Sequence, residues 1–278
     1  MRTVTFCKRN FKELLRDPLG YVFCLGFPIV MMVVFRVVSY FTYASIEAQV
    51  AEQIANGTPS EIANQIFAGV PAWMQLNNLV PGIMVFSYSF VMLYMALLVS
   101  NDKSGAFLTR LYISPMTDSD FVFGYMIPGF VIAIGQSAIC VVCGIVLGIA
   151  TGTEFNFAGA ALSVVYQIPT MLMFVALGIL FGILLNNKSA PGVSSIIISG
   201  SGFLSGAWMD VASMGGYETF CRVLPFYPAV CIGRIALNGA GEQYGKWYYN
   251  LAVVLAWTVA ALILSVLVFR SKRRSDNK

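Results

Sequence analysis

The sequence predicts an all-α polytopic membrane protein with six transmembrane helices and both termini in the cytoplasm. Of its 278 residues, 58% are hydrophobic and only 11% are charged. The apolar residues form runs long enough for a helix to cross a bilayer, which needs about 20 residues, and lipid offers no water to satisfy a non-helical backbone. The predicted spans are 21–41, 80–99, 121–150, 157–185, 189–208 and 248–269.

The positive charges predict the orientation of these spans. With both ends in the cytoplasm, the inner segments hold every Lys and Arg except Arg36, Arg222, Arg234 and Lys246. The acidic residues are divided almost evenly between the two sides, so the asymmetry belongs to the basic residues, as the positive-inside rule requires. The net charge of +4 therefore indicates topology and attraction to anionic lipid, and gives no reason to expect nucleic-acid binding.

Residues 1–20 predict an amphipathic helix that lies in the inner headgroup layer. Basic residues occupy one face, and apolar residues recur at helical spacing on the other: Val4, Cys7, Phe11, Leu14 and Leu15. The pattern leaves open whether this helix is a general interfacial anchor or a docking surface.

Residues 21–278 are expected to form a single transmembrane domain. Its outer segment 42–78 predicts two short helices broken at Asn56-Gly57, and a basic cytoplasmic tail covers 270–278. The second outer segment, 209–247, is too polar to span the membrane but contains apolar runs. Runs of about 10 to 14 residues favour re-entrant or interfacial helices.

Small residues predict where helices approach closely. Each of three GxxxG pairs is expected to form a close contact: Gly144 and Gly148, Gly178 and Gly182, Gly202 and Gly206. We expect packing within the chain for the first two pairs, whereas the third could equally serve an intersubunit contact. Proline residues within the spans predict kinks at Pro28, Pro128 and Pro169.

Several kinds of chemistry are missing from the sequence. There is no His, which excludes HExxH zinc sites and Ser-His dyads, and no GxxxxGK[ST] loop for ATP. We predict no catalytic residue and no metal site, and Cys140 and Cys143 are expected to pack in a span rather than bind metal. Cys221 and Cys231 could pair if the outer compartment is oxidising. Arg36 is the only ionisable residue within a span, which argues against an ion-coupled carrier.

The inner loop 100–120 reads SNDKSGAFLTRLYISPMTDSD and predicts a short helix over 105–113. Together with the amphipathic start, the six spans and the run LPFYPA before the last span, it resembles the membrane subunit of type-2 ATP-binding-cassette (ABC) exporters over essentially the whole chain. Gly105, Arg110, Leu111 and Pro115 match the family's loop. The usual Glu before the Gly is replaced by Asp102-Lys103-Ser104.

The resemblance implies a half-transporter in a prokaryotic inner membrane, paired with a second membrane subunit, identical or related, and with two cytoplasmic ATPases. ATP and Mg would be bound by the ATPases, and this chain would bind no cofactor. The docking residues it implies are Phe11, Lys12, Leu15, Arg16, Asp102, Lys103, Gly105, Phe107, Arg110, Leu111 and Pro115. The implied path residues are Phe86, Phe90, Tyr94, Ser195, Ser199 and Phe203, although ordinary packing of the aromatic residues stays open.

The leading hypothesis is therefore an exporter subunit for an amphipathic or hydrophobic substrate, such as a drug, a peptide antibiotic or a lipid-linked compound. Two other classes remain as alternatives. One is a secondary carrier or channel that needs no nucleotide, and the other is a membrane immunity or scaffold protein. The sequence leaves open both the substrate and the choice between homodimer and heterodimer.

Overall fold

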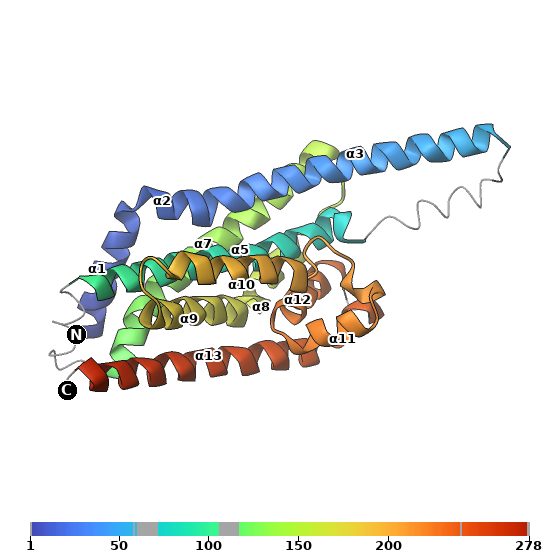
Figure 1. The fold of residues 1–278 in the computed structure, drawn as a ribbon. Helices are drawn as coiled ribbons and strands as arrows, with labels where there is room; N and C mark the ends of the chain where they lie inside the picture. Colours follow the sequence, from blue (N-terminus) through green and yellow to red (C-terminus); the bar gives the residue numbers. More distant parts are fainter. Residues whose placement is uncertain (1, 58, 60–71, 106–116, 240, 277–278) are drawn as a thin grey trace.

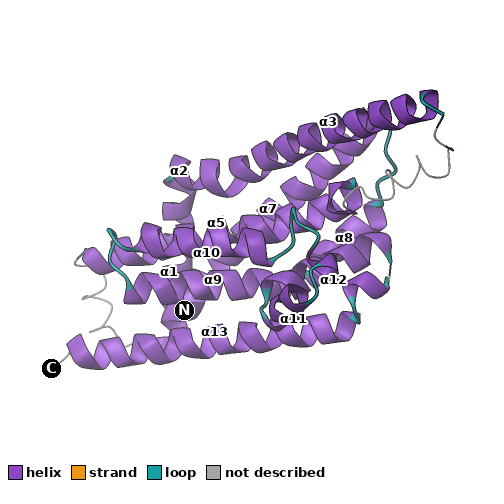
Figure 2. Cartoon of the chain, turned by 45° about the vertical axis from the view of Figure 1, so that its right-hand side comes forward, coloured by secondary structure: helices purple, strands orange, loops and turns teal. Residues whose placement is uncertain are grey.

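The computed structural model describes residues 2–57, 59, 72–105, 117–239 and 241–276, and within these residues it contains helices and no strand (Figure 2). The long helices run side by side, and both chain termini lie at the same end of the bundle (Figure 1). We call this the termini end, and we call the opposite end, which carries α11 and the tip of α3, the far end.

The helices follow one another along the chain in the order of their labels. Their bounds are α1 (Arg2–Arg16), α2 (Pro18–Tyr21), α3 (Phe27–Ala55), α5 (Leu76–Ser104), α7 (Asp118–Thr151), α8 (Phe157–Tyr166), α9 (Ile168–Leu184), α10 (Ala190–Leu204), α11 (Gly216–Val223), α12 (Phe226–Asn238) and α13 (Trp247–Asp276). A π-helical turn, Val22–Gly26, joins α2 to α3.

Among the described residues, four helical segments are long and apolar enough to cross a membrane: Val22–Ala55, Leu76–Ser104, Asp118–Thr151 and Trp247–Arg273. Two bent helix pairs, α8 with α9 and α11 with α12, raise the number to six if each pair is one span. The all-helical, multi-pass architecture predicted from the sequence is therefore confirmed. The predicted fifth span is shorter than expected, because α10 has only 15 residues.

Several predicted boundaries need correction. Helix α3 does not end near residue 41 but continues to Ala55, so the first predicted short helix of segment 42–78 is part of the first span. The predicted break at Asn56-Gly57 is confirmed, and Gly57 has the positive φ of 88° that favours glycine. The second short helix falls outside the described residues. Helix α5 begins at Leu76 and continues to Ser104, which shortens both the outer segment and the inner loop.

Among the three prolines predicted to kink spans, Pro169 lies next to a bend between two helices. The span predicted over 157–185 is divided into α8 and α9 with a bend of 43°, two residues before Pro169. Pro28 lies in the first turn of α3, directly after the π-helical turn, and Pro128 lies within α7 without interrupting it. The kink at Pro169 is thus confirmed.

Helix α5 forms the centre of the bundle, with 89% of its most apolar window buried, whereas α3 and α13 bury only 22% of theirs. A helix that is apolar on every side suits such a surrounded position. The glycines of α9 allow close contact with α5: a Cβ at Gly178 would lie 2.5 Å from the Met92 carbonyl oxygen, and one at Gly182 would lie 2.5 Å from Val99 Cβ. The packing within the chain predicted for this GxxxG pair is confirmed.

The predicted re-entrant segment 209–247 contains α11 and α12, which meet at an angle of 91°. Arg234 of α12 is only 6% exposed and connects three segments of the far end. Its Nε donates to the Asn78 carbonyl at 3.2 Å, and its Nη2 donates to the Gly206 carbonyl at 2.7 Å. Cys221 and Cys231 are both buried in this region and are not bridged.

Candidate functional site

The face of α1 that packs on the bundle agrees only in part with the predicted one, because Leu14 is its only predicted residue that is fully buried. Phe6, Asn10 and Leu14 are buried, and the Asn10 amide donates to the Gly124 carbonyl of α7 at 3.1 Å. Their spacing of four residues forms one stripe on a helix. Val4 and Leu15, which we expected on the apolar face, are 70% and 55% exposed.

None of the predicted docking residues of α1 is fully buried in the bundle. Phe11 is half-buried, and Lys12, Leu15 and Arg16 are exposed.

Asp102, another predicted docking residue, is held in the protein interior at 6% exposure. Its two carboxylate oxygens accept hydrogen bonds from the Arg9 guanidinium at 2.6 and 2.7 Å, and the Tyr125 hydroxyl donates to Oδ2 as well. Glu13 shares the Arg9 guanidinium, at 2.8 Å. Burial alone would lower the pKa of Arg9, but the hydrogen bonds and charge of Asp102 outweigh it and raise the pKa.

This Arg9–Asp102 pair joins three helices, since Arg9 belongs to α1, Asp102 to the end of α5 and Tyr125 to α7. The carboxylate is fully occupied within the chain, so its position suits a link between α1 and α5 better than a contact with a partner. The sequence reasoning missed Arg9 and Tyr125. A buried acid beside a span requires a cation, but no spacing in the sequence distinguishes Arg9 from its basic neighbours.

Lys103 also bonds within the chain. Its Nζ donates to the carbonyl of Ile183 at 2.8 Å and to that of Leu185 at 3.5 Å, at the C-terminus of α9. A cation is favourable there, because the last carbonyls of a helix have no partner in the helix. Asn187, in the turn after α9, bonds to the end of α5 through the side chains of Ser100, Asn101 and Ser104.

The central part of the predicted inner loop lies outside the described residues. It includes Phe107, Arg110, Leu111 and Pro115. At its start, Gly105 is exposed and caps α5, with its N–H donating to the Asn101 carbonyl at 3.2 Å. At its end, Thr117 and Asp120 form a capping box that begins α7.

The predicted path residues of α5 form a stripe near α3 and α10. Phe86 packs edge-on against Trp208, with ring centroids 4.5 Å apart, and Phe90 lies 4.3 Å from the ring of Phe27. Phe86, Phe90 and Tyr94 are all less than 10% exposed. In this single chain, Phe86 and Phe90 are therefore packed among other aromatic residues.

The predicted path residues of α10 have a different environment. Ser195 and Ser199 are exposed, and Phe203 is 57% exposed. The Ser195 hydroxyl donates to the Gly192 carbonyl of its own helix at 2.7 Å. The structure thus does not bring the α10 set and the α5 set together into one lining.

A pocket of about 740 Å³ opens at the termini end between α1, α2, α5 and the start of α10. Apolar side chains dominate its wall, including Phe90, Tyr94 and Leu97 of α5 and Pro191 of α10. Arg16 at the end of α1 lies on the same wall. The pocket therefore places two predicted path residues beside a predicted docking residue, and its volume is typical of sites for drug-sized ligands.

No individual curated protein matches the sequence significantly, but one protein-family model matches most of the chain. The family model for ABC-2 type transporters matches residues 1–237, which include α1, the central helix α5 and the bent pair α11–α12. The chain therefore belongs to the ABC-2 type transporter family and is the membrane subunit of an ABC transporter.

Proposed function

We propose that this chain forms the translocation path of an exporter that moves an amphipathic or hydrophobic molecule outward across a prokaryotic plasma membrane. Its family associates with ATPase subunits. In the proposed complex, two ATPases bind ATP and Mg and supply the energy. A second membrane subunit, either a copy of this chain or a related one, completes the path.

The observation that carries this proposal is the pocket at the termini end. Arg16 of α1 and Tyr94 of α5 border the same cavity, so a displacement of α1 would change its shape. Drug-sized pockets are lined mainly by apolar side chains with a few polar groups, and this one has both. An apolar or amphipathic substrate fits such a wall better than a small ion does.

The Arg9–Asp102 pair supports a mechanism for the coupling. An ATPase can shift a membrane domain between two states only if its contacts differ between them. Through this pair, a displacement of α1 would move the end of α5. The inner loop begins directly after that end of α5. In the proposed mechanism, α1 and the inner loop therefore move together.

The decisive experiment replaces Arg110 with Glu in the inner loop and isolates the complex from native membranes. We expect Arg110→Glu to lower substrate transport and substrate-stimulated ATP hydrolysis together, because the loop would no longer dock. Lys246→Glu, at the far end, is the matched control and is expected to keep both activities. A complex that assembles with Arg110→Glu and transports at the original rate would refute the docking role.

The direction of transport needs a separate measurement. Inside-out vesicles that contain the complex should accumulate the substrate when ATP is supplied outside them. Accumulation without any ATPase subunit would instead favour a secondary carrier. Uptake into right-side-out vesicles loaded with ATP would show import.

A further inference from the structure

Two adjoining pockets at the far end share a wall formed by Asn77, Thr153 and Glu154. One has a volume of about 410 Å³ and lies between α3, the start of α5 and the loop after α7. The other has a volume of about 610 Å³ and lies between that loop and the last turns of α7. Neither pocket shares a residue with the pocket at the termini end.

The smaller pocket is lined by two side chains of opposite charge, Arg36 and Glu154. Arg36 and Tyr40 reach it from α3, and Glu154 closes the opposite side. Among the described residues, Arg36 and Glu154 form no ion pair with each other. Two buried atoms on this wall, Arg36 Nε and Asn77 Oδ1, have no hydrogen-bond partner. Such atoms are rare in folded proteins, and here one donor and one acceptor lack a partner within the described residues.

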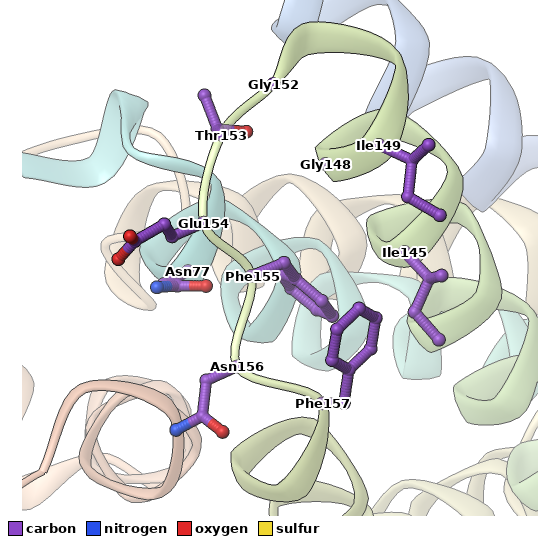
Figure 3. Close-up of a pocket in the computed structure, with 10 residues that line it drawn as sticks. All are labelled: Asn77, Ile145, Gly148, Ile149, Gly152, Thr153, Glu154, Phe155, Asn156 and Phe157. Atoms are coloured by element: carbon purple, nitrogen blue, oxygen red, sulfur yellow. The ribbon is translucent and has the colours of Figure 1, made fainter.

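The larger pocket is mainly apolar. Figure 3 shows Glu154 and Asn77 on one side of the chain and Ile145 and Ile149 of α7 on the other, with the ring of Phe155 between them. Ile149 is 74% exposed, so this pocket opens toward the surroundings of the bundle. A molecule that occupied both pockets would have a polar part beside Arg36 and an apolar part beside α7.

We infer that these pockets bind a zwitterionic amphiphile, with its anionic group at Arg36, its amine at Glu154 and its apolar chain along Ile145 and Ile149. The guanidinium of Arg36 can donate to phosphate or carboxylate oxygens. The exposed carboxylate of Glu154 can accept from an ammonium group. Glu154 would repel a purely anionic headgroup and Arg36 a purely cationic one, so the pair of charges selects a zwitterion.

The test uses the purified full-length chain, without ATPase or nucleotide, and measures lipid retention by native mass spectrometry. The probes are phosphatidylethanolamine and phosphatidylglycerol with identical acyl chains, supplied in equal amounts. The original chain should retain phosphatidylethanolamine preferentially. Arg36→Gln should reduce retention of both lipids about tenfold, because it removes a charged hydrogen bond.

Glu154→Gln should abolish the preference for phosphatidylethanolamine while the protein stays folded, since Glu154 is exposed. Glu47→Gln, on an exposed position of α3 outside both pockets, is the matched control and should change nothing. Equal retention of the two lipids by the original chain would overturn the inference. An unchanged preference in Glu154→Gln would overturn it as well.

The zwitterion can be a resident lipid or a transported molecule, and a second experiment distinguishes these two cases. ATP is added to the complex with its ATPases, and the bound phosphatidylethanolamine is measured before and after turnover. A resident lipid remains bound, whereas cargo is released in proportion to ATP hydrolysis. Both outcomes uphold the site, and failure of the exporter proposal would leave the binding measurement unaffected.

Discussion

Arg9 and Asp102 are separated by 93 residues in the sequence and form an ion pair with two hydrogen bonds, at 2.6 and 2.7 Å. The pair fixes α1 to the end of α5, where the inner loop begins. Asp102 is nearly fully buried, whereas Arg9 is 34% exposed on its side chain. The ion pair therefore lies at the surface of the termini end, and Asp102 is the partner that is shielded from solvent.

Arg9→Gln should destabilise the folded chain and weaken coupling. It leaves the Asp102 carboxylate buried without a cation, which we expect to cost about 1–3 kcal/mol, less than for a fully buried pair because Arg9 is partly exposed. The midpoint of thermal unfolding in detergent measures the first effect. The ratio of ATP hydrolysed to substrate transported measures the second, and it should rise.

Lys8→Gln is the control for this prediction, because Lys8 is an exposed basic residue of the same helix. It should leave the unfolding midpoint and the transport ratio unchanged. Equal behaviour of Arg9→Gln and Lys8→Gln would show that the pair has no role in stability or coupling.

Leu97→Trp should lower transport by filling the pocket at the termini end. The larger ring occupies volume that the proposed substrate needs, so binding of a labelled substrate should weaken while the complex remains assembled. Leu267→Trp, at a 52% exposed position of α13, introduces the same ring outside this pocket and is the control. Undiminished substrate binding by Leu97→Trp would mean that the pocket is not on the path.

Gly178→Ala should destabilise the contact between α5 and α9. The new methyl group would lie 2.5 Å from the Met92 carbonyl oxygen, a backbone atom that cannot move alone. Overpacking of this kind typically costs about 1–3 kcal/mol. Gly135→Ala is the matched control, because a Cβ there meets nothing within 4 Å. Unfolding by denaturing detergent should separate the two variants, and equal stability would argue against close packing.

Arg234→Met should loosen the far end, because it leaves the carbonyls of Asn78 and Gly206 without their donor. Hydrogen bonds to charged groups are worth about 1.5–3 kcal/mol each, so a clear loss of stability is expected. Arg222→Met removes a partly exposed pair with Glu218 in the same helix and a contact of the guanidinium with the Tyr227 ring, 5.7 Å from its centroid, and should change stability by about 1 kcal/mol or less. Faster proteolysis between α11 and α12 in Arg234→Met alone would agree with this role.

The helical architecture could be predicted from the sequence because its causes are local. The length of an apolar run determines whether a helix can span lipid, and the small residues of α9 mark a close contact without reference to the partner. The kink near Pro169 and the break at Gly57 likewise follow from the residues themselves. The end of the first span was wrong because the residues after position 41 continue the helix without a stop signal.

The contacts at the candidate site could not be predicted from the sequence, because they depend on how distant helices pack against one another. Whether Asp102 faces a partner or the interior is decided by the rotation of α5 and by the position of α1, which lies far from it in the sequence. Tertiary packing also decides which face of α1 contacts the bundle, since Leu14 is buried and its neighbour Leu15 is exposed.

The sequence alone thus determined the class of protein, its membrane helices and the family it resembles, because hydrophobic length and motif order are properties of the chain. Only the tertiary structure decided which charges pair and where pockets open. Those depend on contacts between helices that are distant in sequence, and a shift of one helix by a single turn would exchange one set of partners for another.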